Sequence, residues 1–177
     1  MTARRIDHGT DRVAIANPAA DPLAVREPPA DGVLDFHRSL PGYEPSPLVD
    51  APALARRLAV ASVHVKDESS RLGMPSFKIL GASWATYRTL VERLGLTPAD
   101  VPGIAALAEH LEGAGLTLVA ATDGNHGRAV ARMAALLGQS AHVLVPHNMV
   151  AERISAIRGE GARVDVCLLY TSDAADE

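Results

Sequence analysis

The chain has 177 residues, of which 47% are apolar and only 3% aromatic, and its formal net charge is −4. This composition is typical of one folded domain with an aliphatic core, and the small charge gives no electrostatic reason to expect nucleic acid as a partner. There is no apolar run of the roughly 20 residues that cross a membrane, no secretory signal at the start and one cysteine, so the simplest prediction is a cytoplasmic protein without internal disulfides.

Residues 1 to 34 are predicted to form an extended, poorly ordered arm. They are rich in proline, aspartate, arginine and alanine, and they show no hydrophobic periodicity. Pro18, Pro22, Pro28 and Pro29 remove backbone donors and oppose both helix and strand. The folded part is therefore expected over residues 35 to 166.

Hydrophobic periodicity predicts alternating helices and strands in this part. Strands are expected over residues 60–65, 116–121, 141–145 and 163–166, and helices over 31–40, 51–58, 76–94, 104–111, 128–137 and 149–158. Short, continuous apolar strands that alternate with helices indicate an α/β protein with a parallel sheet, helices on both faces and a three-layer, Rossmann-like arrangement. Ligands of such sheets bind at the carboxyl ends of the strands, near helix N-termini.

The last eleven residues, 167–177, depart from this pattern. Residues 163–166 begin a buried strand, but the chain then reads CLLYTSDAADE, which is small, polar and acidic. This string resembles the conceptual translation of a transposon-type sequencing adapter, and we interpret it as a non-native tail. The chain is then an N-terminal fragment, and its fold is incomplete at the C-terminus.

Lys78 is the first candidate for chemistry. It is one of only two lysines, with Lys66, and it is expected on the first turn of the helix that follows Ser76. The helix dipole disfavours an ammonium group at this end and so favours the neutral amine, the form that attacks an aldehyde. The alternative is a solvated lysine at a helix start.

The loop at residues 122–127 is the second candidate, because it joins an apolar strand to a helix. Gly124 and Gly127 allow a close backbone approach, and the helix N-terminus offers free N–H groups to a carboxylate or phosphate. Asn125 can donate a hydrogen bond and Asp123 can act as a base. The alternative is a tight turn that satisfies its own backbone. No partner at metal-site spacing accompanies His126, so no metal site is predicted.

Two further cations follow this loop on the same predicted helix. Arg128 and Arg132 are four residues apart and are expected on a solvated face.

These segments resemble the tryptophan-synthase-β-like (fold type II) family of pyridoxal-phosphate enzymes. The resemblance runs from about Asp35 to Val166, and its main motifs are residues 65–69 (VKDES), 76–82 (SFKILGA) and 122–131 (TDGNHGRAVA), with 36–43 (FHRSLPGY) and 45–48 (PSPL) upstream. It implies a partial enzyme domain over residues 35–166 that includes the start of the family's smaller domain. The Asp-Gly-Asn-His-Gly-Arg string at 123–128 is most similar to the diaminopropionate ammonia-lyases of this family, since dehydratases usually have a small residue in place of Asp123.

The resemblance also implies roles for single residues. Lys78 would form the Schiff base with pyridoxal 5′-phosphate, and Asn125 would hydrogen-bond the phenolic oxygen of the cofactor. Asp123 would be a second catalytic residue, as a base or as the receiver of a substrate ammonium group. The substrate carboxylate would bind in the loop that contains Thr122, Gly124 and His126.

The implied reaction is α,β-elimination of ammonia from 2,3-diaminopropionate to give pyruvate and ammonia. The family holds the cofactor phosphate with a glycine-rich loop, and no such run is present here, so the chain as given is expected to bind the cofactor weakly and to be inactive. The alternatives are a serine/threonine dehydratase-like enzyme and a non-catalytic, Rossmann-like binding module. The resemblance further implies a small amino-acid substrate and a homodimer for the full-length protein.

Overall fold

The structure is a computed structural model that describes residues 5, 6, 14, 15, 32–122 and 124–167. The chain divides into two units, Met1–Ala30 and Asp31–Glu177. In the first unit, β1 (Arg5–Ile6) pairs antiparallel with β2 (Ala14–Ile15). The other residues of the predicted arm up to 31 lie outside the described residues. In the part that the structure describes, no helix has the length and apolarity needed to cross a membrane.

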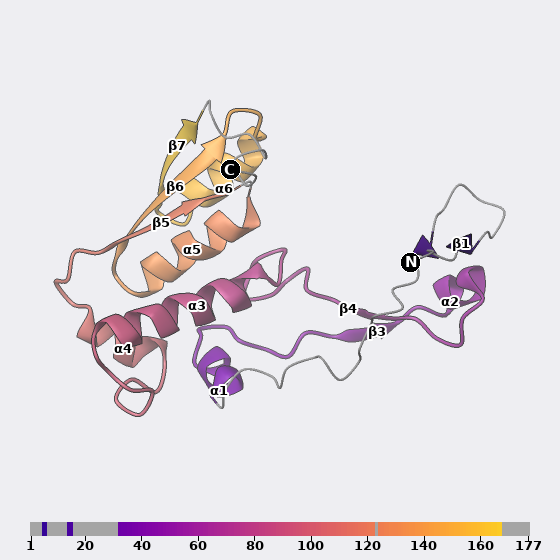
Figure 1. Ribbon diagram of the computed structural model, residues 1–177, viewed down its shortest axis with the longest axis horizontal. Helices are drawn as coiled ribbons and strands as arrows, with labels where there is room; N and C mark the ends of the chain where they lie inside the picture. Colours follow the sequence, from indigo (N-terminus) through magenta and orange to yellow (C-terminus); the bar gives the residue numbers. More distant parts are fainter. Residues whose placement is uncertain (1–4, 7–13, 16–31, 123, 168–177) are drawn as a thin grey trace. The chain divides into compact units, whose positions relative to one another are not determined.

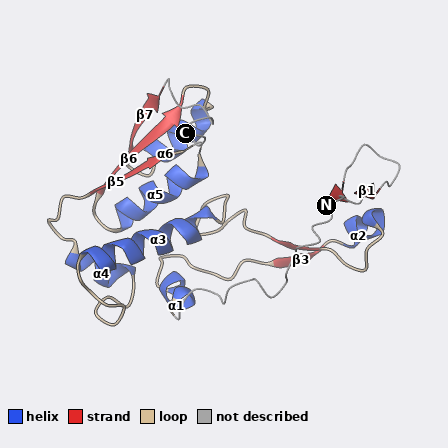
Figure 2. Ribbon diagram, in the orientation of Figure 1, coloured by secondary structure: helices blue, strands red, loops and turns tan. Residues whose placement is uncertain are grey.

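The second unit contains the elements that position the candidate site (Figures 1 and 2). Its helices are α1 (Val33–Arg38), α2 (Pro52–Leu58), α3 (Lys78–Arg93), α4 (Ile104–His110), α5 (Asn125–Leu136) and α6 (Ala151–Arg158). Its strands are β3 (Leu48–Asp50), β4 (His64–Lys66), β5 (Thr117–Ala121), β6 (Ser140–Pro146) and β7 (Arg163–Cys167). Of the predicted non-native tail, Cys167 ends β7, and residues 168–177 lie outside the described residues.

A parallel sheet of order β5-β6-β7 confirms the predicted α/β class. Leu118, Val143 and Val164 point to the face that α5 and α6 cover, and Ile157 of α6 is fully buried there. The sequence predicts helices on both faces of this sheet. In the described residues, 32–122 and 124–167, helices α5 and α6 both cover the same face. Val119, which points to the other face, is 63% exposed. Consecutive right-handed crossovers that advance in one direction put their helices on the same side.

The first predicted strand, at residues 60–65, is wrong in its bounds, and it does not join the parallel sheet. The strand is β4 (His64–Lys66), and it pairs antiparallel with β3 in a separate two-stranded sheet. Helix α2 ends in a left-handed residue at Ala59 (φ 53°), and the chain turns there before it reaches β4. All three β4 residues are exposed, so this strand is not part of the buried parallel sheet.

Helix α3 confirms the long helix predicted after Ser76, although it begins two residues later. The Oγ of Ser76 accepts a hydrogen bond from the Lys78 N–H (3.2 Å) and so supports the first turn. Helix α3 packs against α5, and the larger core lies between these two helices and α1 and α4. Within this core the hydroxyl of Tyr87 donates to the Val101 carbonyl (2.6 Å). Among the described residues, every buried side-chain polar atom has such a partner.

Candidate active site

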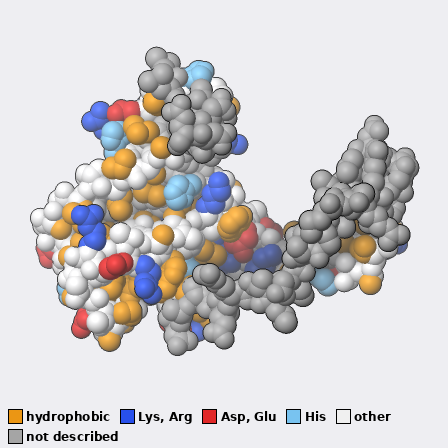
Figure 3. Space-filling model, in the orientation of Figure 1, with side chains coloured by type: hydrophobic (Ala, Val, Ile, Leu, Met, Phe, Trp, Pro, Cys, Tyr) orange, Lys and Arg blue, Asp and Glu red, His pale blue; other side chains and the backbone are white. Residues whose placement is uncertain are grey.

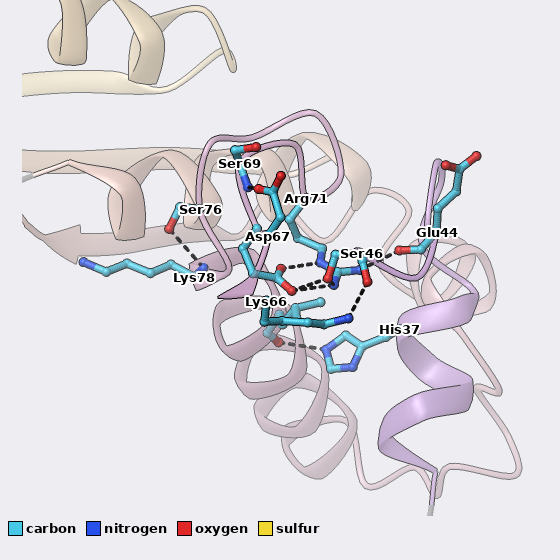
Figure 4. A network of polar contacts seen from close by, with 11 residues as sticks. His37, Glu44, Ser46, Lys66, Asp67, Ser69, Arg71, Ser76 and Lys78 are labelled. Carbon is cyan, nitrogen blue, oxygen red and sulfur yellow. Dashed lines mark hydrogen bonds and ion pairs between the residues drawn. The ribbon is translucent and has the colours of Figure 1, made fainter. Parts of the chain in front are cut away.

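Lys78 is the first residue of α3, and its side chain is exposed. The loop before it, residues 67–77, is fixed by polar contacts that Figure 4 shows. In that view the side chain of Lys78 points away from the contacts, which leaves its amine accessible to a ligand. Lys66, the other lysine, donates from Nζ to the Ser46 carbonyl and is held in the loop network.

The network around Arg71 fixes the start of this loop. The guanidinium of Arg71 is buried, and it donates to both carboxylate oxygens of Glu68 (Nε–Oε2 2.7 Å, Nη2–Oε1 2.8 Å) and to the Glu44 carbonyl (2.6 Å). The hydroxyl of Ser46 contacts both members of the ion pair. The hydrogen bonds from Arg71, which outweigh the effect of burial, lower the pKa of the Glu68 carboxyl to about 2.

The loop of the second motif lies between the end of β5 and the start of α5. Thr122 is buried, and its backbone N–H donates to the Leu144 carbonyl (3.0 Å), which continues the pairing of β5 with β6. Its Oγ1 accepts a hydrogen bond from the Gly124 N–H (3.3 Å). Gly124 has a φ of +152°, a conformation that L side chains rarely adopt. Asp123 lies outside the described residues.

Gly127 shows why the first turn of α5 requires a second glycine. A Cβ at this position would lie 2.4 Å from Cγ2 of Thr122 and 2.7 Å from Cγ1 of Val143. Helix α5 thus approaches the sheet more closely than any side chain allows. This approach sets the N-terminal N–H groups of the helix directly at the carboxyl end of β5.

A pocket of about 380 Å³ joins the two motifs. Pro75 comes from the loop that precedes Lys78, and Gly124 and Asn125 come from the start of α5. The remaining lining residues are Arg128 of α5 and Glu152, Arg153 and Ala156 of α6. Of the predicted site residues, Gly124 and Asn125 line this pocket, whereas Lys78 does not and only Pro75, three residues before it, does.

Of the other two predicted substrate residues, Thr122 does not line this pocket and His126 lines a different one. His126 lines a groove of about 300 Å³ between α3, β5 and α5 that also contains Leu90, Val119 and Val130. Figure 3 shows hydrophobic side chains over this part of the surface. The predicted role of His126 in holding a substrate stays a prediction. The sequence does not single out Glu152 and Arg153 as pocket residues. The one feature that could indicate them is their position on α6, the helix that follows β6.

The predicted solvated face of Arg128 and Arg132 is wrong. The Nε of Arg128 donates to Oε1 of Glu160 (2.9 Å), and Arg132 contacts both oxygens of the same carboxylate. The side chain of Glu160 is 8% exposed. Its burial raises the pKa of the carboxyl, but the hydrogen bonds from Arg132 and Arg128 outweigh this effect and keep the pKa below its usual value. The acid that pairs these arginines is 28 residues or more along the chain, so spacing does not reveal it.

Comparison with known proteins places this geometry in a family. A family model described as "Pyridoxal-phosphate dependent enzyme" matches residues 40–177. Diaminopropionate ammonia-lyase from Escherichia coli K12 is 40% identical over 130 residues, which make up 72% of this chain and 31% of that protein. The enzyme of the same name from Salmonella typhimurium is 38% identical over 149 residues, 80% of this chain and 36% of that protein.

Solved structures agree with the sequence comparison. The apo form of the E. coli diaminopropionate ammonia lyase aligns with a TM-score of 0.68 and 36% identity, over 80% of this chain and 38% of that one. A pyridoxal 5′-phosphate-dependent aspartate racemase, at a TM-score of 0.57 and 23% identity, shares the fold. The chain spans about a third of the length of the curated relatives that it matches. On the match over residues 40–177, the chain belongs to the family of pyridoxal-phosphate dependent enzymes.

Proposed function

We propose that this chain is part of a pyridoxal-phosphate-dependent carbon–nitrogen lyase that eliminates ammonia from 2,3-diaminopropionate. The observation that carries the proposal is the pocket that Pro75, three residues before Lys78, forms with the N-terminus of α5. The names of the relatives supply the substrate, because they are diaminopropionate ammonia-lyases at up to 40% identity.

Lys78, three residues from the pocket residue Pro75, and Asn125 of the pocket wall fit the cofactor chemically. A cofactor that carries an aldehyde needs an accessible primary amine, and Lys78 offers one, since none of the described ion pairs or side-chain hydrogen bonds engages its Nζ. The phenolic oxygen of the cofactor needs a donor, which the exposed Asn125 side chain supplies at the pocket wall. Lys66 fits less well, because its amine already donates to a carbonyl.

The same pocket fits an amino-acid carboxylate. The N–H groups at the start of α5 face an anion favourably, and Gly124 leaves the backbone open to close approach. Arg153, whose Cδ lies 3.4 Å from the Cβ position at Gly124, adds positive charge beside these donors. Thr122 fixes the loop through the Gly124 N–H.

When bound, the cofactor supplies an electron sink for the negative charge that develops at Cα. Lys78 would hold the cofactor through Nζ, and the same amine, when free, would take the Cα proton of the substrate. Asp123 is the second proton-holding group, on its carboxylate oxygens, and it either serves the opposite enantiomer or receives the β-ammonium of the substrate. The N–H groups at the α5 N-terminus would hold the substrate carboxylate and so limit the orientations of its Cα proton.

Asp123→Ala separates this proposal from its runner-up, a serine/threonine dehydratase-like enzyme. In the full-length polypeptide we expect kcat/KM for diaminopropionate to fall by about 100-fold, as loss of a general base does, while any turnover of serine changes by less than about threefold. The assay is pyruvate formation from each substrate. Asp100→Ala, which removes an exposed carboxylate paired with Thr97 away from the pocket, is the matched control. Equal losses on both substrates would support the dehydratase.

A further inference from the structure

The loop before Lys78 contains a turn in an unfavourable conformation. Residues 71–74 form a β-turn that the Met74 N–H closes by donating to the Arg71 carbonyl (2.9 Å). Its central residues are Leu72 (φ 51°) and Gly73 (φ 73°). Glycine adopts positive φ freely, but leucine does so at a cost of about 1 kcal/mol, so other contacts must hold Leu72 in place.

Helix α5 supplies one of these contacts through Arg132. The Nη1 of Arg132 donates to the Leu72 carbonyl (3.4 Å), while its Nε and Nη2 bind the two oxygens of Glu160. The planar guanidinium of Arg132 thus joins Leu72 of the turn to Glu160, which lies two residues beyond the end of α6. Arg128 binds the same carboxylate and so fixes Glu160 from a second position on α5.

The position of Arg132 on α5 connects this turn to the proposed site. Asn125 at the start of α5 lines the pocket, and Arg132 lies seven residues further along the same rigid helix, about 10 Å away. The turn at Leu72 leads through Pro75, which also lines the pocket, to Lys78. The contact between Arg132 and Leu72 therefore joins the segment that contains Pro75 to α5.

We propose that Arg132, held by Glu160, is a positioning residue that clamps the Leu72–Gly73 turn to α5 and so sets Lys78 against the helix N-terminus. The inference rests on the proposed function and adds to it a residue that positions the loop before Lys78. A partly buried ion pair contributes little net stability compared with apolar side chains of similar size, whereas it does fix a single arrangement of the groups that it joins. Removing Arg132 leaves Glu160 with Arg128 as its remaining described partner, so Arg132→Met is also expected to lower stability, and the clamp is tested on the turn and on Lys78 instead.

Arg132→Met tests the clamp against Arg163→Met. Both variants remove an arginine from an ion pair, but Arg163 binds Asp165 on β7 and has no contact with the turn. We expect the Gly73 and Met74 amides of Arg132→Met to exchange with deuterium about tenfold faster, and the pyridoxal phosphate concentration that half-labels Lys78 after borohydride reduction to rise about tenfold. Arg163→Met should change neither quantity. Arg132→Lys, which keeps the charge but lacks the fork, should lie between the wild type and Arg132→Met.

Each outcome of this experiment decides a separate claim. If Arg132→Met only lowers the melting temperature, and the turn amides and half-labelling concentration stay as in the wild type, the clamp is wrong. If the wild type is not labelled at Lys78, the proposed function is wrong. The exchange rates of the Gly73 and Met74 amides then show by themselves whether Arg132 holds the turn. Should Arg132→Met not fold, Arg132→Lys gives the same two measurements with the charge retained.

Discussion

Replacing Arg71 by methionine will lower the free energy of unfolding by about 3 kcal/mol, because it removes the guanidinium that donates to both oxygens of the Glu68 carboxylate and to the Glu44 carbonyl. Arg71 is among the few buried charged residues in the described part of the chain, and all three nitrogens of its guanidinium donate hydrogen bonds. Urea unfolding at pH 7 measures the change. Arg88→Met is the matched control, since both arginines lie over an aromatic ring, at 5.6 Å for Arg71 and 5.7 Å for Arg88, but only Arg71 is buried.

The same pair gives a pH dependence with a definite sign. The folded pKa of Glu68 is about 2, below its ordinary value of 4.5, so the stability that this carboxylate contributes is complete above pH 4.5 and is lost as the pH falls towards 2. The stability difference between the wild type and Arg71→Met should therefore narrow as the pH falls from about 5 to 3. A difference that stays constant over this range would show that the ion pair is not its source.

Gly127→Ala is expected to destabilise the chain by about 2 kcal/mol. The new methyl group would overlap Thr122 and Val143, both of which are buried, and this cost exceeds the roughly 1 kcal/mol that alanine gains over glycine within a helix. Thr122 also accepts a hydrogen bond from the Gly124 N–H. A displacement of Thr122 should therefore also weaken anion binding at the N-terminus of α5. Thermal unfolding measures the first effect.

Gly81→Ala is the control for Gly127→Ala. Gly81 lies inside α3, it is exposed, and a Cβ built there meets nothing within 4 Å beyond its chain neighbours and the nearby backbone of its own helix. The same substitution should then stabilise the chain by about 0.5–1 kcal/mol through helix propensity alone. If both variants shift stability in the same direction, the close approach of α5 to the sheet is not as described.

The local parts of the site could be predicted from the sequence. A strand, a glycine-containing loop and a helix follow one another at residues 116–137, and this order alone predicts that Gly124 and Asn125 lie at the carboxyl end of a strand. Lys78 stands out because the chain has only two lysines. The prediction of α3 failed only at its ends, where capping decides the boundary.

The parts that depend on distant partners could not be predicted. Glu160 pairs with two arginines of α5 from beyond β6 and α6, and the periodicity of α5 alone cannot show this contact. Residues 60–65 have the composition of a buried strand. In the structure the chain turns at Ala59, and the strand that follows, β4, pairs antiparallel with β3. Glu152 and Arg153 reach the pocket only through the crossover after β6.

The most direct test of the account is to identify the amine that binds the cofactor. The chain is incubated with an excess of pyridoxal 5′-phosphate and reduced with borohydride, and the labelled peptide is mapped by mass spectrometry, with Lys78→Arg and Lys66→Arg as matched variants that keep the charge and lose the primary amine. The account predicts label on Lys78 in the wild type and in Lys66→Arg, and at least about a tenfold loss in Lys78→Arg. Label on Lys66, or equal labelling of both variants, would contradict it.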